Sequence, residues 1–453
     1  ACVMGKYGTY PHYSESGTLW LGLLPSHWDL KPFWTLFSRV KRTGNESAEL
    51  LSVYRDYGVI KKSSRDDNFN KPSEDLSSYQ LVKKRDLAMN KMKAWQGSLG
   101  ISEFEGIVSP AYFVFEPKHA QCDKYLHYLL RSPEYIAGYL SNSKGIRVNQ
   151  WDIDPQYHSR MPVALPPLSE QSQIATFLDR ETAKIDRLIE KQQRLIELLE
   201  EKRQAVISHA VTKGLKPDAP MKDTGVEWLG EVPGHWHVNK VKHLCYVNDG
   251  NHGEEYPTEE DYTDSESGVA FIRGGNMRNL TITAKNMLYI TKEKNNSMRK
   301  GRLMSGDILF MNRGEIGKIA KVPTEFAGAN LNSQIAYLRP TSSEVVSDFL
   351  LYFLSSTELD NLIKSMKMGS VLTQFPIANI LEISVPLPSV EEQSEIIEEL
   401  KKSTEIMDKL TEKAKGFIEL SKERRTALIS AAVTGKIDVR DQVPQDVEEA
   451  VAS

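Results

Sequence analysis

The sequence predicts an α+β protein, in which two mixed α/β domains are joined by two long antiparallel helices and related by a pseudo-two-fold axis from internal duplication. Three observations support this prediction. A long amphipathic helix occurs twice, a short tryptophan-containing marker occurs twice, and both helices carry an apolar stripe that suits a helical partner. At 453 residues the chain is also longer than one ordinary hydrophobic core, which favours two domains.

The marker opens each half of the chain. It reads Trp-Leu-Gly-x-x-Pro-x-His-Trp, and its copies occupy residues 20–28 and 228–236. A globular region follows each marker, and the two regions show little sequence similarity to each other. Each half is therefore predicted to consist of a marker, a variable globular region and a long helix.

The long helix closes each half. Its copies span residues 171–212 and 393–434 and agree at most apolar positions. Ser389, followed three residues later by a glutamate, predicts a capped start for the second copy. Gly214 and Gly435 are predicted to end the two helices, because glycine readily adopts the left-handed conformation that terminates a helix.

An apolar stripe with alternating four- and three-residue spacing runs along both helices. Such a narrow stripe is typical of a coiled-coil seam. Burying both stripes against each other in an antiparallel pair is the simplest arrangement, and the alternative is that each helix packs on its own globular region. The predicted seam residues are Ile174, Leu178, Ile185, Leu188, Leu195, Leu199, Val206, Ile396, Leu400, Met407, Leu410, Phe417 and Leu428.

These features predict the domain boundaries. We expect a first recognition domain at 1–160, a first spacer helix at 161–216, a second recognition domain at 217–385, a second spacer helix at 386–440, and an acidic disordered tail at 441–453. The chain begins at Ala1, and we expect this to be a processed or trimmed start.

The composition is that of a soluble globular protein, with 40% hydrophobic and 26% charged residues. No apolar run approaches the length of a membrane span, and the N-terminus lacks a secretory pattern. The three cysteines, Cys2, Cys122 and Cys245, lie far apart in the sequence. We therefore expect a cytoplasmic protein with reduced thiols.

The charge is unevenly distributed. A net charge of −4 at first argues against a nucleic-acid partner. However, residues 30–160 contain 20 Lys and Arg against 15 Asp and Glu, whereas residues 238–385 contain 16 against 17. A local basic groove in the first globular region is compatible with this pattern.

The duplicated architecture predicts a bipartite ligand. Duplex DNA has local two-fold symmetry, and half-sites about 34–36 Å apart can be read from one face. Two different globular domains on matching helical spacers predict an asymmetric target, with one half-sequence for each domain and unread base pairs between.

Several sequence elements resemble a known family. Pro166-Pro-Leu-Ser-Glu-Gln171, Pro386-Leu-Pro-Ser-Val-Glu-Glu-Gln393 and the marker are similar to the conserved regions of the specificity subunit (HsdS) of type I restriction–modification enzymes. Residues 90–100 with 106–112 resemble one type of target-recognition domain in that family. Gly306-Asp-Ile-Leu-Phe310 followed by Arg313-Gly-Glu-Ile-Gly-Lys318 resembles another.

This resemblance implies a DNA-binding subunit with no catalytic centre and no cofactor or metal of its own. The implied partners are double-stranded DNA, two modification subunits that dock on the helices and methylate adenine N6, and two restriction subunits that are ATP-dependent motor-nucleases. The whole complex would use S-adenosylmethionine, ATP and Mg, and no membrane is implied. The alternatives are a subunit of a methylation-only or fused restriction system, and a coiled-coil protein adaptor.

Two motifs could suggest an enzyme or a metal site instead. Gly314-Glu-Ile-Gly317-Lys318 is loosely similar to a phosphate loop, but its glycines are too close, and we predict a turn between strands at 307–311 and 318–322. The group His235, His237, His243 and Cys245 lacks the spacing of a zinc site. A methyltransferase would also need an Asn/Asp-Pro-Pro-aromatic motif, and Pro166-Pro167 lies between leucines.

Base recognition favours Arg, Lys, Asn and Gln on loops, because these side chains can make paired hydrogen bonds to base edges. In the first globular region the candidates are Asn90, Lys91, Lys93 and Gln96. In the second region they are Arg273, Asn276, Arg278, Arg313, Lys318 and Asn332. An ordinary polar loop is an equally good interpretation of each residue taken singly.

Overall fold

The computed structural model describes residues 7–55, 57–65, 72–147, 150–367 and 374–442. The chain divides into two compact units, and the boundary passes through both long helices. Unit one contains residues 1–193 and 415–453, and unit two contains residues 194–414. Cys2 and the predicted tail beyond Gln442 lie outside the described residues. None of the helices in the described part of the chain combines the length and the hydropathy needed to cross a membrane.

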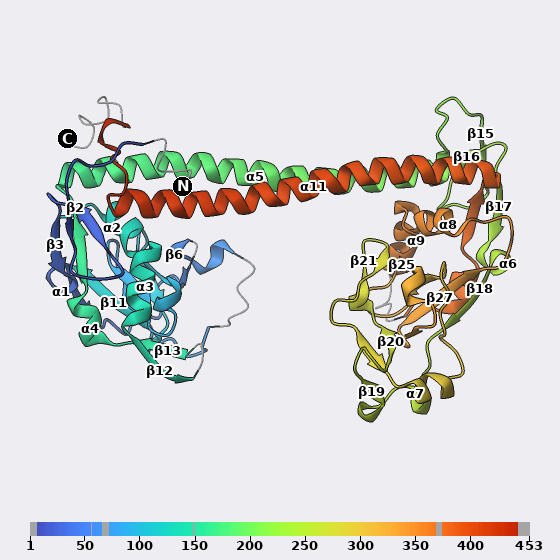
Figure 1. Ribbon diagram of the computed structural model, residues 1–453, viewed down its shortest axis with the longest axis horizontal. Coiled ribbons are helices and arrows are strands. Elements are labelled where there is room, and N and C mark those ends of the chain that lie inside the picture. The colour runs from blue at the N-terminus through green and yellow to red at the C-terminus, as the bar shows by residue number, and fades with distance from the viewer. Residues whose placement is uncertain (1–6, 56, 66–71, 148–149, 368–373, 443–453) are drawn as a thin grey trace. The chain divides into compact units, whose positions relative to one another are not determined.

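Unit one is built around a four-stranded antiparallel sheet with the order β4-β11-β8-β9 (Figure 1). These strands are β4 (Phe37–Val40), β8 (Leu87–Asn90), β9 (Leu99–Ile101) and β11 (Tyr112–Pro117). The two-stranded pairs are β1 (Tyr13–Glu15) with β2 (Leu23–Pro25), β3 (Asp29–Pro32) with β14 (Pro162–Leu165), β5 (Leu51–Tyr54) with β6 (Gly58–Lys61), β7 (Gln80–Val82) with β10 (Gly106–Val108), and β12 (Ser143–Arg147) with β13 (Gln150–Ile153). The helices are α1 (Phe33–Leu36), α2 (Asp123–Leu130), α3 (Pro133–Ser141) and α4 (Pro155–Arg160).

Unit two contains a sheet of the same design, with the order β18-β27-β24-β25. These strands are β18 (Cys245–Asp249), β24 (Ile308–Met311), β25 (Ile319–Lys321) and β27 (Ile335–Pro340). A second sheet has the order β19-β23-β20-β26, with β19 (Tyr262–Thr263), β20 (Val269–Ile272), β23 (Leu288–Ile290) and β26 (Asn330–Leu331). The remaining pairs are β15 (Met221–Asp223) with β16 (Glu231–Pro233), β17 (His237–Lys240) with β28 (Ser384–Leu387), and β21 (Met277–Arg278) with β22 (Thr281–Ile282). The helices are α6 (Val241–Leu244), α7 (Lys292–Ser297), α8 (Ser347–Leu354), α9 (Thr357–Lys367) and α10 (Ile377–Leu381).

The two units repeat one scaffold despite their different sequences. In each unit the marker contributes a strand to a β-hairpin, and the next strand pairs with the strand that precedes the long helix. Two further helices, α2 and α3 or α8 and α9, pack on the four-stranded sheet through a shared apolar core. The units differ in what is inserted beside this sheet, which is β5, β6, β7 and β10 in unit one and the second sheet with the β21–β22 hairpin in unit two.

The long helices are α5 (Leu168–Lys213) and α11 (Val390–Val433). Strand β14 therefore occupies the start of the segment predicted as the first spacer helix. The Ser389 hydroxyl accepts a hydrogen bond from the Glu392 amide at 3.2 Å, which confirms the predicted cap. Gly214 and Gly435 have φ angles of 76° and 68°, in the left-handed region expected of terminating glycines.

Within each unit the two long helices run antiparallel. In unit one Arg425 Nε lies 2.9 Å from Asp186 Oδ1, and in unit two Arg203 forms an ion pair with Asp408. Asp408 lies 222 positions after Asp186, and Arg425 lies 222 positions after Arg203. The two ion pairs are thus copies of one contact, so the duplication has kept the helix register in both units.

The seam differs from the predicted one at four of the thirteen predicted positions. Leu188, Leu195, Leu410 and Phe417 are exposed by 40–45%, and this part of the prediction is wrong. The helices instead bury or half-bury the residue one place later, namely Ile189, Ile196, Thr411 and Ile418. The prediction chose Leu188 and Leu195 over neighbouring isoleucines, and a one-residue step turns a side chain by about 100° around the helix. The other nine predicted seam residues are buried or half-buried: Ile174, Leu178, Ile185, Leu199, Val206, Ile396, Leu400, Met407 and Leu428.

A buried glutamate joins the marker to the start of each long helix. Glu170 Oε1 accepts hydrogen bonds from the Tyr10 hydroxyl at 2.6 Å and Trp28 Nε1 at 3.0 Å, and Glu170 Oε2 lies 2.8 Å from His27 Nε2. A Cβ atom placed on Gly435 would lie 3.3 Å from the Trp28 ring. The marker tryptophan therefore contacts both the start of α5 and the end of α11. We call this group the unit-one clamp.

The same clamp occurs in unit two. Glu392 Oε1 accepts a hydrogen bond from Trp236 Nε1 at 3.2 Å, and Glu392 Oε2 lies 2.8 Å from His235 Nε2. A Cβ atom on Gly214 would lie 3.3 Å from the Trp236 ring. The clamp explains why His and Trp recur in the marker, because both hold the glutamate at the helix start.

Candidate nucleic-acid interface

In each unit, a hollow brings several of the predicted recognition residues together. In unit one this hollow, the unit-one pocket, has a volume of about 620 Å³. Strand β5 forms one wall, and Asn90, Lys93 and Gln96 line another. Three of the four residues predicted for this unit are therefore brought together.

Lys91 is the exception in unit one. Its Nζ donates a hydrogen bond to the Pro110 carbonyl at 2.6 Å and lies 5.1 Å from the centre of the Phe113 ring. Lys91 is absent from the pocket lining, and its role in DNA binding stays a prediction. Lys91 follows the last residue of β8 and lies in the turn after that strand.

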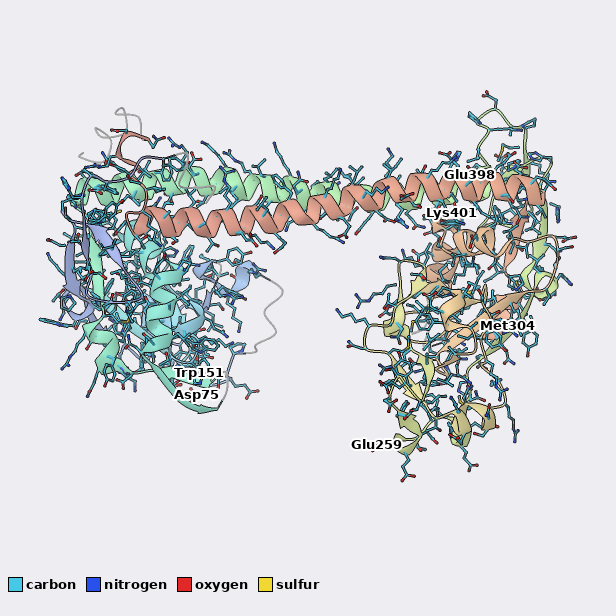
Figure 2. The ribbon with its side chains drawn as sticks, viewed as in Figure 1. Asp75, Trp151, Glu259, Met304, Glu398 and Lys401 are labelled. Atoms are coloured by element: carbon cyan, nitrogen blue, oxygen red, sulfur yellow. The ribbon has the colours of Figure 1, made fainter. Side chains whose placement is uncertain are left out.

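The turn from Asn90 to Gln96 is fixed by local contacts. Asn90 Oδ1 accepts a hydrogen bond from the Met92 amide at 3.1 Å, and Trp95 Nε1 donates to the Met92 carbonyl at 2.9 Å. The Trp95 ring packs against Trp151, labelled in Figure 2, with 4.8 Å between ring centres. Lys93 and Gln96 make no side-chain hydrogen bond with any residue that the structure describes, and both remain available to a ligand.

The unit-one pocket is also aromatic. Tyr54, Tyr79 and Tyr112 line it together with Arg55 and Lys62. Burial raises the pKa of Tyr112, so its hydroxyl stays protonated at neutral pH and can both donate and accept a hydrogen bond. Tyrosine rings and amides suit the faces and edges of nucleotide bases.

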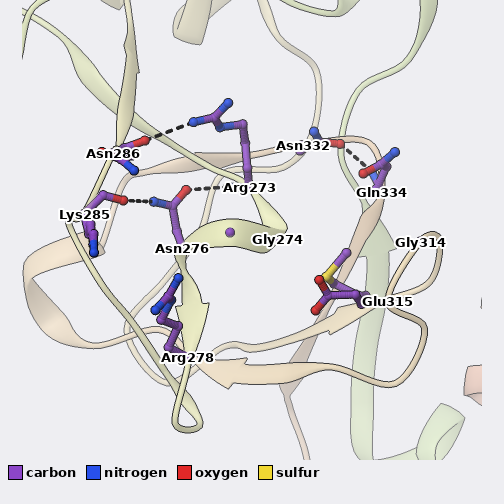
Figure 3. A pocket seen from close by; sticks show the side chains of 12 residues that line it. Arg273, Gly274, Asn276, Arg278, Lys285, Asn286, Gly314, Glu315, Asn332 and Gln334 are labelled. Carbon is purple, nitrogen blue, oxygen red and sulfur yellow. Dashed lines mark hydrogen bonds between the residues drawn. The ribbon is translucent and has the colours of Figure 1, made fainter. Parts of the chain in front are cut away.

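The unit-two pocket has a volume of about 610 Å³ and is shown in Figure 3. Its residues are Arg273, Gly274, Gly275, Asn276, Arg278, Lys285, Asn286, Met311, Gly314, Glu315, Asn332 and Gln334. Four of the six predicted residues of this unit lie here, namely Arg273, Asn276, Arg278 and Asn332. The loop after β20, the β21–β22 hairpin and the start of β27 carry most of the polar groups.

Asn276 builds the pocket and is not free to read a base. Its side chain accepts a hydrogen bond from the Arg273 amide at 3.0 Å and donates to the Thr283 and Lys285 carbonyls at 3.3 and 3.1 Å. Asn276 is 2% exposed. Every hydrogen-bonding group of this amide is engaged, which contradicts the prediction for Asn276.

Arg273 and Asn332 are also partly engaged. One Arg273 terminal nitrogen donates to the Asn286 carbonyl at 3.0 Å. Asn332 donates to the Tyr256 hydroxyl at 3.2 Å and accepts from the Gln334 amide at 2.8 Å. These contacts fix the two sides of the pocket.

Arg313 and Lys318 lie outside this lining. Lys318 Nζ forms an ion pair with Glu315 Oε2 at 2.7 Å, across the turn between β24 and β25. The prediction of a turn between two strands is confirmed here. Arg313 forms a backbone bridge with Gln374. The structure therefore does not place Arg313 and Lys318 with the other predicted residues.

Comparison with known proteins assigns this arrangement to a family. The sequence matches the family described as "Type I restriction modification DNA specificity domain" over residues 39–200 and 233–420, more than half of the chain. The chain belongs to this family. The two matched segments begin near the two markers and end within the two long helices, so each half of the duplication corresponds to one specificity domain.

Two type I restriction enzyme specificity subunits align with much of the chain. It is 26% identical over 377 residues to the type I restriction enzyme MjaVIII specificity subunit of Methanocaldococcus jannaschii, covering 81% of this chain and 84% of that protein. It is 25% identical over 317 residues to the type I restriction enzyme EcoBI specificity subunit of Escherichia coli, covering 67% of this chain and 64% of that protein.

Two solved structures share the fold. One chain, from work on complex assembly and conformational transition of the type I R-M system, matches with a TM-score of 0.67 at 16% identity, covering 90% of this chain and 98% of that one. The HsdS subunit from Thermoanaerobacter tengcongensis matches with a TM-score of 0.50 at 17% identity, covering 91% and 98%.

The sequence prediction also missed several residues that line the two pockets. The missed residues include Lys285 and Gln334 in unit two and Arg55 and Lys62 in unit one, and the unit-one pair lies at least 28 residues before Asn90. One local signal existed, since Gln334 follows Asn332 by two residues at the start of a strand. The others became visible only when folding brought separate loops together.

Proposed function

We propose that this chain recognises DNA sequence for a type I restriction–modification complex, and that each unit reads one half of a bipartite, asymmetric target. The observation that supports this proposal is one scaffold with two unlike pockets. The clamps and the helix register are repeated, whereas the pocket linings share no pattern. Identical readers would suit a palindrome, and unlike readers suit two different half-sites.

The proposed partners follow from the family. We propose that two modification subunits dock on the long helices and methylate adenine N6, and that two restriction subunits add an ATP-dependent nuclease. The apolar residues Leu188, Leu195, Leu410 and Phe417 support a docking role for the helices, since they occupy equivalent positions on both helices and are 40–45% exposed in the described part of the chain. S-adenosylmethionine, ATP and Mg are assigned to those subunits, and this chain is proposed to be non-catalytic.

Methylation mapping tests the proposed recognition. The chain would be co-expressed with its modification subunit in a host that lacks other adenine methylation, and methylated adenines would be located by single-molecule sequencing. We expect one motif with two unlike half-sites separated by a fixed unspecified gap. A continuous motif, a palindromic motif or the absence of any motif would contradict the proposal. Footprinting of the same complex separates DNA recognition from a protein-only adaptor, which would give no sequence-specific protection.

A second experiment tests the spacer role of the helices. Deleting one heptad from α5 and one from α11 removes about 10 Å of helix, at about 1.5 Å per residue. At about 3.4 Å per base pair, the unspecified gap should shorten by about three base pairs while both half-sites stay the same. An unchanged gap in a folded, active complex would contradict the spacer role.

A further inference from the structure

Within the unit-two pocket, polar residues divide into those that build it and those that remain free. Arg273, Asn276 and Asn332 make hydrogen bonds that hold loops together, and Glu315 forms an ion pair with Lys318. In contrast, Arg278, Lys285 and Gln334 are exposed, and their side chains make no hydrogen bond or ion pair with any residue that the structure describes. A ligand in this pocket therefore meets two planar groups, the Arg278 guanidinium and the Gln334 amide, and one flexible cation.

The free Arg278 is mounted on an anchored hairpin. It lies in β21, directly before a turn in which Asn279 and Leu280 have φ angles of 49° and 61°. Leu280 is a non-glycine residue in the left-handed region, which costs free energy unless neighbouring contacts hold it. It packs against the apolar core, and its carbonyl accepts a hydrogen bond from the Lys321 amide at 2.9 Å. The hairpin therefore presents Arg278 from a fixed position.

Gln334 is presented with similar precision. Its backbone N–H donates a hydrogen bond to Asn332 Oδ1 at 2.8 Å, and its backbone carbonyl accepts one from the backbone N–H of Asn312 at 3.1 Å. The backbone is held on both sides, and only the side chain is free. Figure 3 shows Arg278 and Gln334 on different sides of Gly274, whose backbone forms part of the pocket lining.

We propose that Arg278 and Gln334 select bases in the half-site that unit two reads, and that Arg278 selects a guanine. This inference rests on the proposed function. A guanidinium donates two parallel hydrogen bonds that match O6 and N7 of guanine, and a glutamine amide matches N6 and N7 of adenine. Fixed backbones reduce the entropy lost when these side chains bind. Lys285 is a point charge on a flexible chain, so it is assigned to backbone phosphate.

The test compares Arg278→Ala with Lys285→Ala, two exposed cations on the same pocket. Each variant is assembled with wild-type modification subunits, and methylation rates are measured on DNA with every base at each position of the target. Arg278→Ala should lose discrimination for a guanine at one position of one half-site, by roughly 5- to 150-fold, and leave the other half-site unchanged. Lys285→Ala should weaken binding to all sequences alike and reduce the salt-dependence slope by about one.

Further variants separate charge from geometry. Arg278→Lys keeps the positive charge but not the paired donors, so it should also lose guanine discrimination. Gln334→Ala should relax a different position of the same half-site. Three outcomes would overturn the inference: a half-site without guanine, unchanged discrimination in Arg278→Ala, or a uniform loss in Arg278→Ala like that of Lys285→Ala. If the wild-type complex shows no bipartite motif, the proposed function itself fails, so the two failures are distinguishable.

Discussion

The two units agree where they hold the helices and differ in the residues that line their pockets. Both units bury a glutamine at the start of the long helix, and Gln171 and Gln393 are 0% exposed. Gln171 accepts a hydrogen bond from the backbone N–H of Cys122, just before α2, and Gln393 accepts one from Val346, just before α8. By contrast, three tyrosines line the unit-one pocket, whereas two arginines and three glycines line the unit-two pocket. Positions that set geometry have kept their chemistry after duplication, whereas positions that line the pockets have changed.

The clamps themselves are not equal. The Glu170 side chain is 5% exposed and accepts a third contact, from Tyr10. The Glu392 side chain is 22% exposed, and no described residue makes a contact with it like that of Tyr10 with Glu170. Burial, followed by the hydrogen bond to Glu170, raises the pKa of Tyr10 and keeps its hydroxyl a donor. Unit one should therefore depend more on its clamp than unit two.

Replacing each clamp glutamate by alanine gives the largest expected effect. Glu170→Ala leaves the donors of Tyr10 and Trp28 without an acceptor, at about 1–3 kcal/mol each, so unit one should lose about 3–5 kcal/mol of unfolding free energy. Glu392→Ala leaves one buried donor, Trp236, in a partly hydrated site, and unit two should lose about 1–2 kcal/mol. Hydrogen exchange in increasing denaturant resolves the two units. Equal losses would contradict the difference between the clamps.

Acid should also affect the units differently. His158 in unit one is 2% exposed, and burial lowers its pKa from 6.5 to about 3. The histidines of unit two, such as His243 and His252, are exposed. Because the folded pKa of His158 lies below the unfolded value, unfolded chains bind the proton first as the pH falls. The unfolding free energy of unit one should therefore be highest above about pH 6.5 and should decrease as the pH falls from 6.5 toward 3.

Hydrogen exchange at a series of pH values measures this loss for each unit. The control is His158→Phe, which removes the titrating group but keeps an aromatic ring beside Phe33 and Phe115. The variant should show a flatter dependence of unit-one stability on pH between 6.5 and 3. The same slope in the variant and the wild type would assign the acid sensitivity to other groups.

The interhelical ion pairs give the smallest expected effect. Asp186 and Asp408 have side chains exposed by 51% and 62%. Exposed ion pairs contribute about 0–1 kcal/mol, so Asp186→Asn and Asp408→Asn should each cost less than about 1 kcal/mol. Because the two pairs are copies of one contact, the two losses should be similar, in contrast to those of the clamps. Thermal unfolding at low and high salt measures them, and a loss above 2 kcal/mol in either variant would contradict a surface role.

Repetition made the scaffold predictable from sequence. The copied markers and helices indicated two similar halves with paired helices, and Ser389, Gly214 and Gly435 marked helix ends correctly. The seam was only half predictable, because leucine and isoleucine at adjacent positions, as at 195 and 196, give the same hydrophobicity on different faces. Tertiary contacts decided which one is buried.

The recognition residues were less predictable for a physical reason. Residue type identifies side chains able to bind a base, but not whether they are already engaged. Asn276 and Arg278 are only two positions apart, yet one supports the pocket and the other is free. Gln334 joins them from a segment 56 residues after Arg278, and only the folded chain shows that these residues line one pocket.

The most direct test of the proposal that each unit recognises one half-site is to exchange the globular region of one unit. Residues 30–155 would be replaced by the corresponding region of another family member, leaving the marker's Trp28, the clamp glutamate and both long helices in place. Methylated adenines would then be mapped for the exchanged and wild-type complexes. We predict that one half-site changes while the other half-site and the gap stay the same. A change in both half-sites, or in neither, would contradict independent readers on a shared scaffold.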